Sequence, residues 1–229
     1  MRVIDVETPM PRIARVTAIE YPHHITQRGN YRQTIFETDD DYLQYLKWLK
    51  AYSDKYTLYI WAYCLMSNHV HYVCVPMKEE SLSRTFNMLH MRYAQHVNRR
   101  KQVSGHLWQG RFYSSILDER HAYAAVRYVG NNPVRAGIVK RAEDYPWSSA
   151  REHITGRTGN SISVSSYLED EIPSWKEYLS EKEDEAAINS IRRNAMTGRP
   201  CGEGSFIEKL EQKFSRRLRA LPYGRPRKG

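Results

Sequence analysis

Two histidines one residue apart are the side chains of this sequence best placed to do chemistry. His69 and His71 follow Asn68 and begin a segment rich in β-branched and aromatic residues, which favours a strand. Side chains two positions apart on a strand project to the same face, with Cβ atoms about 7 Å apart, so both imidazoles can converge on one ion. Neutral imidazole binds divalent metals. The spacing therefore suggests a metal site, although most such pairs are ordinary surface or core histidines. The ordinary interpretation applies to five others: His90, His96, His106, His121 and His153.

A tyrosine and an asparagine at helical spacing form the second candidate, in the segment Tyr128-Val-Gly-Asn-Asn132. Residues at i and i+4 share a helix face about 6 Å apart, so an Asn132 amide oxygen could be a third ligand while the Tyr128 phenol points at the same centre. Alternatively, Tyr128 is a core aromatic, and Asn132 with Pro133 only ends the helix. Tyr113 and Tyr123 compete as nucleophiles, but neither has an acceptor-type residue four positions later.

These groups would complement one another in phosphodiester chemistry. A phenol has a pKa of about 10 and is a poor nucleophile at neutral pH unless the electrophile is activated. A divalent cation on the scissile phosphate polarises it and stabilises the charge of the transition state. A phosphotyrosine would keep the energy of the phosphodiester, so a hydroxyl could reverse the reaction and rejoin the strands. We find no convincing general base in the sequence.

The pattern of apolar residues predicts the elements that must position these groups. Residues 21–28 favour a strand that ends at the Gly29-Asn30 turn, and the acids at 39–41 begin a helix. The later elements are strands at 57–66 and 69–75, a helix at 82–97, a basic loop at 99–105, a strand at 111–117 and a helix at 118–130. This order is typical of the ferredoxin-like split-βαβ fold, an α+β class with an antiparallel sheet.

Composition narrows the class of protein. The 229 residues are 41% hydrophobic and include 17 Tyr and 5 Trp, as in a globular protein. Apolar runs are far shorter than the roughly 20 residues that cross a bilayer. Cys64, Cys74 and Cys201 have neither a disulfide nor a zinc spacing. We therefore expect a cytoplasmic, nucleoid-associated protein.

Charge is segregated along the chain. The formal net charge is +9, residues 81–117 contain no Asp or Glu, residues 196–229 are basic, and residues 169–185 between them are acidic. Positive segments beside Tyr, Trp and His suit a polyanion with stackable bases. A solubilising surface explains the charge equally well.

We expect three regions: a leader at 1–12, a catalytic domain at 13–156, and a helical, basic extension at 157–229. In the extension, Ser205 and Glu208 suggest a capping box that opens a helix with Phe206, Leu210 and Phe214 on one face.

Six motifs occur in order within residues 11–156: YPHHITQRGN (21–30), AYCLMSNHVHYV (62–73), RYAQHVNRR (92–100), GHLWQGRF (105–112), RYVGNNPVRAGIV (127–139) and YPWSSA (145–150). Their combination resembles the single-tyrosine transposases of the HUH superfamily, and specifically the REP-associated tyrosine transposases. The segments GRPCG (198–202) and GRPRK (224–228) are similar to the extension of that family.

The resemblance implies a role for each candidate. His69 and His71 would be metal ligands, Tyr128 the nucleophile and Asn132 an auxiliary ligand, where the small insertion-sequence relatives have glutamine. Mg²⁺ or Mn²⁺ would be the cofactor. The expected reaction is nicking and rejoining of single-stranded DNA that carries hairpins or palindromic repeats, through a 5′-phosphotyrosine. The insertion-sequence relatives dimerise; we expect a monomer here, with a homodimer as the alternative.

Two other functions remain open. A domesticated, non-catalytic protein could bind the same hairpins as a regulator. A replication initiator or relaxase is disfavoured because the chain is short and has no P-loop pattern.

Cations and an aromatic residue near the motifs are the candidates for DNA contacts. Arginines would track phosphates and the tryptophan would stack on an unpaired base, although each is also explained as a solvated cation or a core aromatic. The candidates are Arg28, Asn30, Arg92, Arg99, Arg100, Lys101, Trp108 and Arg111.

Overall fold

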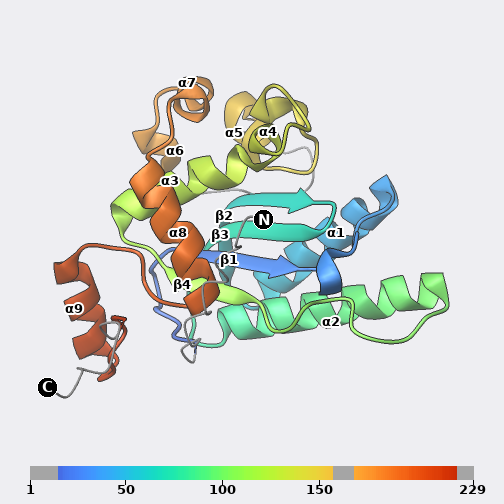
Figure 1. Ribbon diagram of the computed structural model, residues 1–229, viewed down its shortest axis with the longest axis horizontal. Coiled ribbons are helices and arrows are strands. Elements are labelled where there is room, and N and C mark those ends of the chain that lie inside the picture. The colour runs from blue at the N-terminus through green and yellow to red at the C-terminus, as the bar shows by residue number, and fades with distance from the viewer. Residues whose placement is uncertain (1–14, 157–167, 221–229) are drawn as a thin grey trace, which may run out of the picture.

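A four-stranded antiparallel sheet lies at the centre of the computed structural model, which describes residues 15–156 and 168–220 (Figure 1). The strands are β1 (His23–Arg28), β2 (Leu58–Met66), β3 (His69–Pro76) and β4 (Tyr113–Ile116), and their order in the sheet is β2-β3-β1-β4. A helix connects β1 to β2 and another connects β3 to β4. The predicted α+β fold with a split-βαβ order is therefore confirmed. The expected leader at 1–12 and the GRPRK segment lie outside the described residues.

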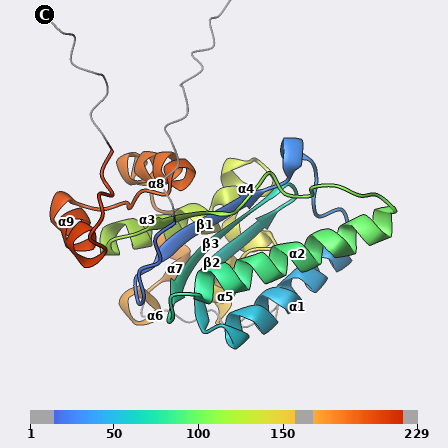
Figure 2. The ribbon, with the colours of Figure 1, turned by 90° about the horizontal axis from the view of Figure 1, so that it is seen from below.

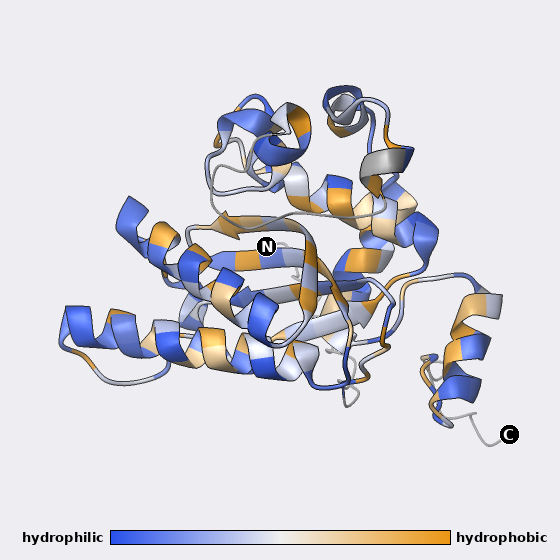
Figure 3. Cartoon of the chain, turned by 180° about the vertical axis from the view of Figure 1, so that it is seen from behind, coloured by the Kyte–Doolittle hydropathy of each residue, from blue (hydrophilic) through white to orange (hydrophobic). Residues whose placement is uncertain are grey.

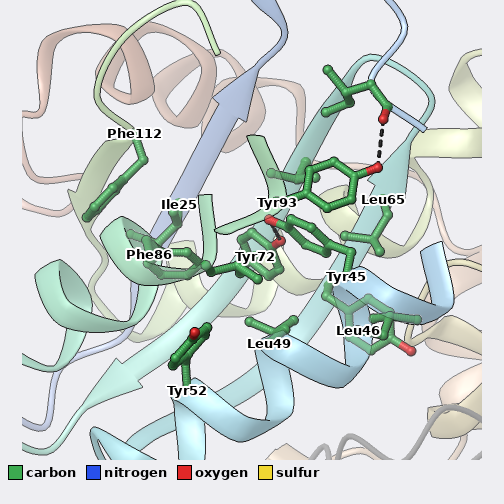
Figure 4. Packing of buried hydrophobic residues seen from close by; sticks show 14 of the residues in the cluster. Ile25, Tyr45, Leu46, Leu49, Tyr52, Leu65, Tyr72, Phe86, Tyr93 and Phe112 are labelled. Carbon is green, nitrogen blue, oxygen red and sulfur yellow. Dashed lines mark hydrogen bonds between the residues drawn. The ribbon is translucent and has the colours of Figure 1, made fainter. Parts of the chain in front are cut away.

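Helices α1 (Asp39–Lys55) and α2 (Ser81–Lys101) cover one face of the sheet, while α3 (Glu119–Gly130) lies on the opposite face (Figure 2). Both α1 and α2 carry hydrophilic and hydrophobic residues in alternation along their length (Figure 3), and their buried residues recur at helical spacing. The core between them is rich in buried tyrosines, whose hydroxyls are paired (Figure 4). Tyr72 donates to Tyr45 at 2.7 Å and Tyr93 donates to the Ile35 carbonyl at 2.7 Å. These bonds satisfy polar groups that would be costly to bury alone.

Helix α3 (Glu119–Gly130) lies on the opposite face, beside α8 (Glu185–Thr197) from the C-terminal extension. The Asp118 side chain accepts a hydrogen bond from the His121 backbone N–H and so caps the start of α3. The buried side of α3 is small and apolar, at helical spacing, and packs on β2 and β3: Ala122, Ala125, Val126 and Val129. Helix α8 packs on β4, on β1 and against α3.

Short helices complete the described chain: η1 (Asn30–Arg32), α4 (Asn132–Arg135), η2 (Ala142–Asp144), α5 (Ala150–Thr155), α6 (Leu168–Glu171), α7 (Trp175–Ser180) and α9 (Gly204–Lys213).

The extension is joined to the sheet at Cys201. Its N–H donates to the Ile116 carbonyl at 2.8 Å, and its carbonyl accepts from the Asp118 N–H at 2.9 Å. Backbone bonds therefore connect the extension to the end of β4.

Two local predictions were wrong. The basic loop expected from Arg99 is helical as far as Lys101, because three cations stabilise the C-terminal end of α2, and Gln102 then ends it with a φ of 53°. The expected Ser205–Glu208 capping box is also absent: α9 begins at Gly204, and its N-cap residue Glu203 makes no side-chain capping bond. The apolar face of α9 does pack, around buried Leu210.

Within the described ranges, we find no helix with the length and apolar character needed to span a membrane. The expected cytoplasmic and nucleoid-associated location stays a prediction.

An acidic loop between α7 and α8 pairs with arginines at both ends of α3 and at the end of α4. Glu181 pairs with Arg127, Glu183 pairs with Arg135, and Asp184 pairs with Arg120 at 2.6 Å. The Asn131 amide also donates to the Leu179 carbonyl at 2.7 Å. The acidic segment seen in the sequence thus neutralises cations of the helix that carries Tyr128.

We expect Glu183→Gln to destabilise the protein by about 1–2 kcal/mol, because Arg135 would stay largely shielded from water without its charged partner. The measurement is urea unfolding followed by circular dichroism. Glu208→Gln is the matched control, since its pair with Arg219 is exposed and should matter little. Equal urea midpoints for Glu183→Gln and Glu208→Gln would contradict the conclusion that the Glu183–Arg135 pair stabilises the fold.

Candidate active site

His69 and His71 lie on the face of the sheet that α3 covers. The register of β3 with β1 pairs His69 with Arg28 and His71 with Thr26, so all four side chains leave the same face. The two imidazole ring centroids are 5.0 Å apart, with the ring planes nearly perpendicular. The strand geometry expected from the HxH spacing is therefore present.

Each histidine has its Nδ1 atom engaged by a neighbour. Asn68 donates its Nδ2 to the Arg32 carbonyl at 3.3 Å, which turns its Oδ1 towards His69, 2.6 Å from Nδ1. An amide oxygen only accepts, so His69 Nδ1 carries the proton and Nε2 carries the lone pair. His71 Nδ1 lies 3.0 Å from Nε2 of His24, a residue of β1. A proton on His71 Nδ1 would leave its Nε2 as the ligand atom.

The environment keeps these imidazoles neutral. Burial lowers the pKa of His69 to about 4, with Arg28 contributing, and burial lowers the pKa of His24 to about 4. The pKa of His71 lies well below its ordinary value because of burial and, secondarily, of the surrounding imidazoles and Arg135. Neutral rings with free Nε2 lone pairs are the form that binds a divalent metal.

The donor set of the pair fits a metal but is incomplete. Within the described residues, no three His, Cys, Asp or Glu side chains are grouped so as to hold an ion. A third protein ligand would thus have to be of another type, and an amide oxygen such as that of Asn132 meets this requirement.

Tyr128 lies directly over the histidines. Its ring is edge-on to His71, with centroids 5.7 Å apart, and edge-on to His24 at 6.0 Å. The residue is half-buried among the apolar residues beneath α3. The structure therefore brings together the predicted nucleophile and the predicted metal ligands within one chain.

Asn132 is not on the same helix as Tyr128. Helix α3 ends at Gly130, Asn131 caps it, and Asn132 is the first residue of α4, followed by Pro133. The expected single helical face was wrong, because Pro133 is compatible with the first turn of a new helix but not with the interior of a continuing one. Asn132 is 8% exposed.

Two arginines lie against the ring of Tyr128. The Arg135 guanidinium is 4.1 Å from the ring centroid and donates to the Tyr128 carbonyl. Arg192, an exposed residue of α8, approaches the ring to 5.5 Å. Because Glu183 neutralises Arg135, Arg192 supplies the positive charge beside the phenol that suits a phosphate.

Sequence reasoning did not single out His24, Arg135 or Arg192. His24 could have been noticed as the second histidine of the YPHHITQR segment, and Arg135 lies within the RYVGNNPVRAGIV motif. No local signal marks Arg192, because only the packing of α8 brings it to the site.

Tyr113 is on the same face of the sheet as the histidines. It pairs with Thr26 of β1, which pairs in turn with His71 of β3. One strand, β1, separates Tyr113 on β4 from the histidines on β3, whereas the Tyr128 ring contacts His71 directly.

The candidate DNA contacts divide into three groups. The first group has access to solvent or to the histidines. Arg28 lies beside His69. Arg99 and Arg111 are exposed, and Asn30 is partly exposed. Arg92 covers the Trp48 ring and donates to the Tyr52 hydroxyl. Arg100 and Lys101 pair with acids that begin or precede α1, Asp41 and Glu37.

Trp108 belongs to the core. It is 9% exposed, packs on His90 with centroids 4.5 Å apart, and donates its indole N–H to the His90 carbonyl at 2.9 Å. A ring held in this way cannot stack on a base unless the loop rearranges. The structure therefore agrees with the alternative interpretation of Trp108 as a core aromatic residue.

Comparison with known proteins places the chain in a family. Residues 17–132 match the family profile described as "Transposase IS200 like". The putative REP-associated tyrosine transposase of Haemophilus influenzae is 24% identical over 147 residues, which cover 56% of this chain and 84% of that protein. A solved REP-associated tyrosine transposase bound to a REP hairpin superposes with a TM-score of 0.54 at 19% identity, over 69% of this chain and 95% of the other. The chain therefore belongs to the IS200-like transposase family, and the expected similarity to REP-associated tyrosine transposases is confirmed.

Proposed function

We propose that this protein is a metal-dependent endonuclease and strand transferase that nicks and rejoins hairpin-flanked single-stranded DNA. The observation that carries the proposal is the position of the Tyr128 ring, which is perpendicular to the rings of His71 and His24. The His71 ring in turn lies next to that of His69. Family membership supports a transposase, and the solved relative bound to a REP hairpin supports hairpin DNA as the partner.

The proposed step is a transesterification at one phosphate. The Tyr128 Oη forms a bond to phosphorus, the bond from phosphorus to the 3′ oxygen breaks, and the proton lost by the phenol balances the one gained by the 3′-hydroxyl. A 3′-hydroxyl attacking the phosphotyrosine reverses these changes and joins the strands. Arg192 is exposed beside the ring and can bind the phosphate oxygens, whereas Arg135 is held by Glu183 and by the Tyr128 carbonyl.

His69, His71 and Asn132 would hold Mg²⁺ or Mn²⁺. When bound, such a cation supplies Lewis-acid polarisation of the scissile phosphate. The chain itself keeps both imidazoles neutral and directs their Nε2 atoms away from Asn68 and His24. The tyrosine lies over the histidines of its own chain, which supports action as a monomer.

We expect Tyr128→Phe to abolish the covalent adduct with a labelled hairpin oligonucleotide in Mn²⁺, because the phenylalanine ring keeps the packing but has no nucleophilic oxygen. Denaturing gel electrophoresis measures the adduct. Tyr113→Phe is the control, since it removes a hydroxyl from the same face of the sheet and should leave the adduct intact. A persistent adduct in Tyr128→Phe would refute the nucleophile. Tight hairpin binding without cleavage by the wild type would favour a non-catalytic regulator.

His24→Phe should weaken Mn²⁺ binding about 10–100-fold, because His71 loses the partner that orients its ring. Titration calorimetry measures the affinity, and circular dichroism shows whether the variant is folded. His96→Phe, on α2 beside Trp48, is a matched control that should bind Mn²⁺ like the wild type. An unchanged affinity in a folded His24→Phe variant would remove His24 from the site.

A further inference from the structure

Tyr31 is the most exposed large hydrophobic side chain in the described part of the chain, at 94%. It lies in η1, the turn that follows β1 at the same end of the sheet as His69. In Figure 1 this turn is the short blue coil at the tip of the β1 arrow. A tyrosine this exposed gains no stability from burial, so its position calls for another explanation.

The backbone of the turn is strained and rigid. Tyr31 and Arg32 have φ values of 49° and 59°, in the left-handed region that residues with side chains rarely adopt. Three backbone bonds hold them there: Asn30 N–H to the Leu107 carbonyl at 2.8 Å, Arg32 N–H to Gly29 at 3.0 Å, and Gln33 N–H to Asn30 at 2.9 Å. A Cβ on Gly29 would lie 2.5 Å from the Gln33 carbonyl oxygen. The turn therefore fixes the backbone from which the Tyr31 side chain projects into solvent.

One side chain connects this turn to the candidate metal site. Asn68 donates its Nδ2 to the Arg32 carbonyl and accepts from His69 with its Oδ1. The Gly29 N–H also donates to the Asn68 carbonyl at 2.9 Å. The position of Tyr31 is thus coupled through Asn68 to the orientation of the His69 ring.

The surroundings of Tyr31 indicate the kind of partner. Its exposed neighbours in the sequence are polar or cationic, namely Arg32, Gln33 and Thr34. Arg28, the last residue of β1, lies beside His69. An apolar protein partner would meet a single ring among polar groups. An unpaired base offers a π-face to the phenol, while its phosphate meets the arginines.

We propose that Tyr31 is a base-stacking residue that receives an unpaired nucleotide of the DNA at the His69 end of the site. The inference rests on the proposed function and specifies how the strand is held there. The same stacking would place the neighbouring phosphate near Arg28. Asn68 is a positioning residue that ties this contact to His69.

The test uses the full chain carrying Tyr128→Phe, so that binding is measured without cleavage. The probe is a short dT oligonucleotide with one 2-aminopurine, whose fluorescence is quenched when it stacks on an aromatic ring. Tyr31→Ala and Tyr31→Asn should each bind about tenfold more weakly and quench less. Asparagine tolerates the left-handed backbone, so it separates loss of the ring from loss of the turn. Tyr31→Phe and Tyr31→Trp should keep the affinity.

Two controls make the outcome specific. Tyr59 is 51% exposed and lies at the start of β2, at the end of the sheet far from His69. Tyr59→Ala should therefore not change the binding of the oligonucleotide. An oligonucleotide with abasic positions in place of the bases should bind equally well to Tyr31→Asn and to the parent protein, because no base is present to stack.

Unchanged affinity of Tyr31→Asn for the base-bearing probe would overturn this inference and leave the proposed function standing. An equal loss on the abasic probe would also overturn it, because the turn would then act only through its backbone. A wild-type protein that neither binds single-stranded DNA nor forms an adduct would overturn the proposed function itself.

Discussion

The antiparallel pairing of β1 with β3 is the constraint on which the candidate site depends. Its register sets Arg28 opposite His69 and Thr26 opposite His71, and it brings His24 within hydrogen-bond distance of His71. A shift of either strand by one residue would turn the side chains of that strand to the face covered by α1 and α2. Ile25 of β1 and Tyr72 of β3 are buried in the core on the face that α1 and α2 cover. Their burial maintains the register of the two strands and thereby the geometry of the site.

The extension shapes the surroundings of Tyr128 as much as the sheet shapes those of the histidines. Helix α3 presents Tyr128, while α8 brings Arg192 to its ring and the acidic loop before α8 binds Arg135 and Arg127. The segregated charge of the sequence therefore has a structural meaning that composition did not reveal. Part of the positive charge is neutralised by the acidic segment, and part is left around the phenol.

The two ends of the site differ in what they offer a DNA strand. At the Tyr128 end Arg192 adds a positive charge that suits a phosphate, and at the His69 end a rigid turn carries the exposed ring of Tyr31. Asn68 lies between the turn and His69, with its amide fully committed by the Arg32 carbonyl and the imidazole. Strain in that turn is maintained by hydrogen bonds from the loop before β4, so distant parts of the chain cooperate in shaping it.

The sequence by itself determined the order of strands and helices, because hydrophobic periodicity and turn residues are local properties. It also singled out the HxH pair and Tyr128, since spacing along a strand or helix sets which side chains share a face. It was wrong to expect one helix face for Tyr128 and Asn132, because Pro133 starts a new helix. It left Trp108 open between a DNA contact and a core aromatic, and only the packing decided for the core. Only the tertiary structure decided that His24, Arg135 and Arg192 border the site. Their positions depend on strand register and on the packing of segments far apart in the chain, which no local pattern encodes.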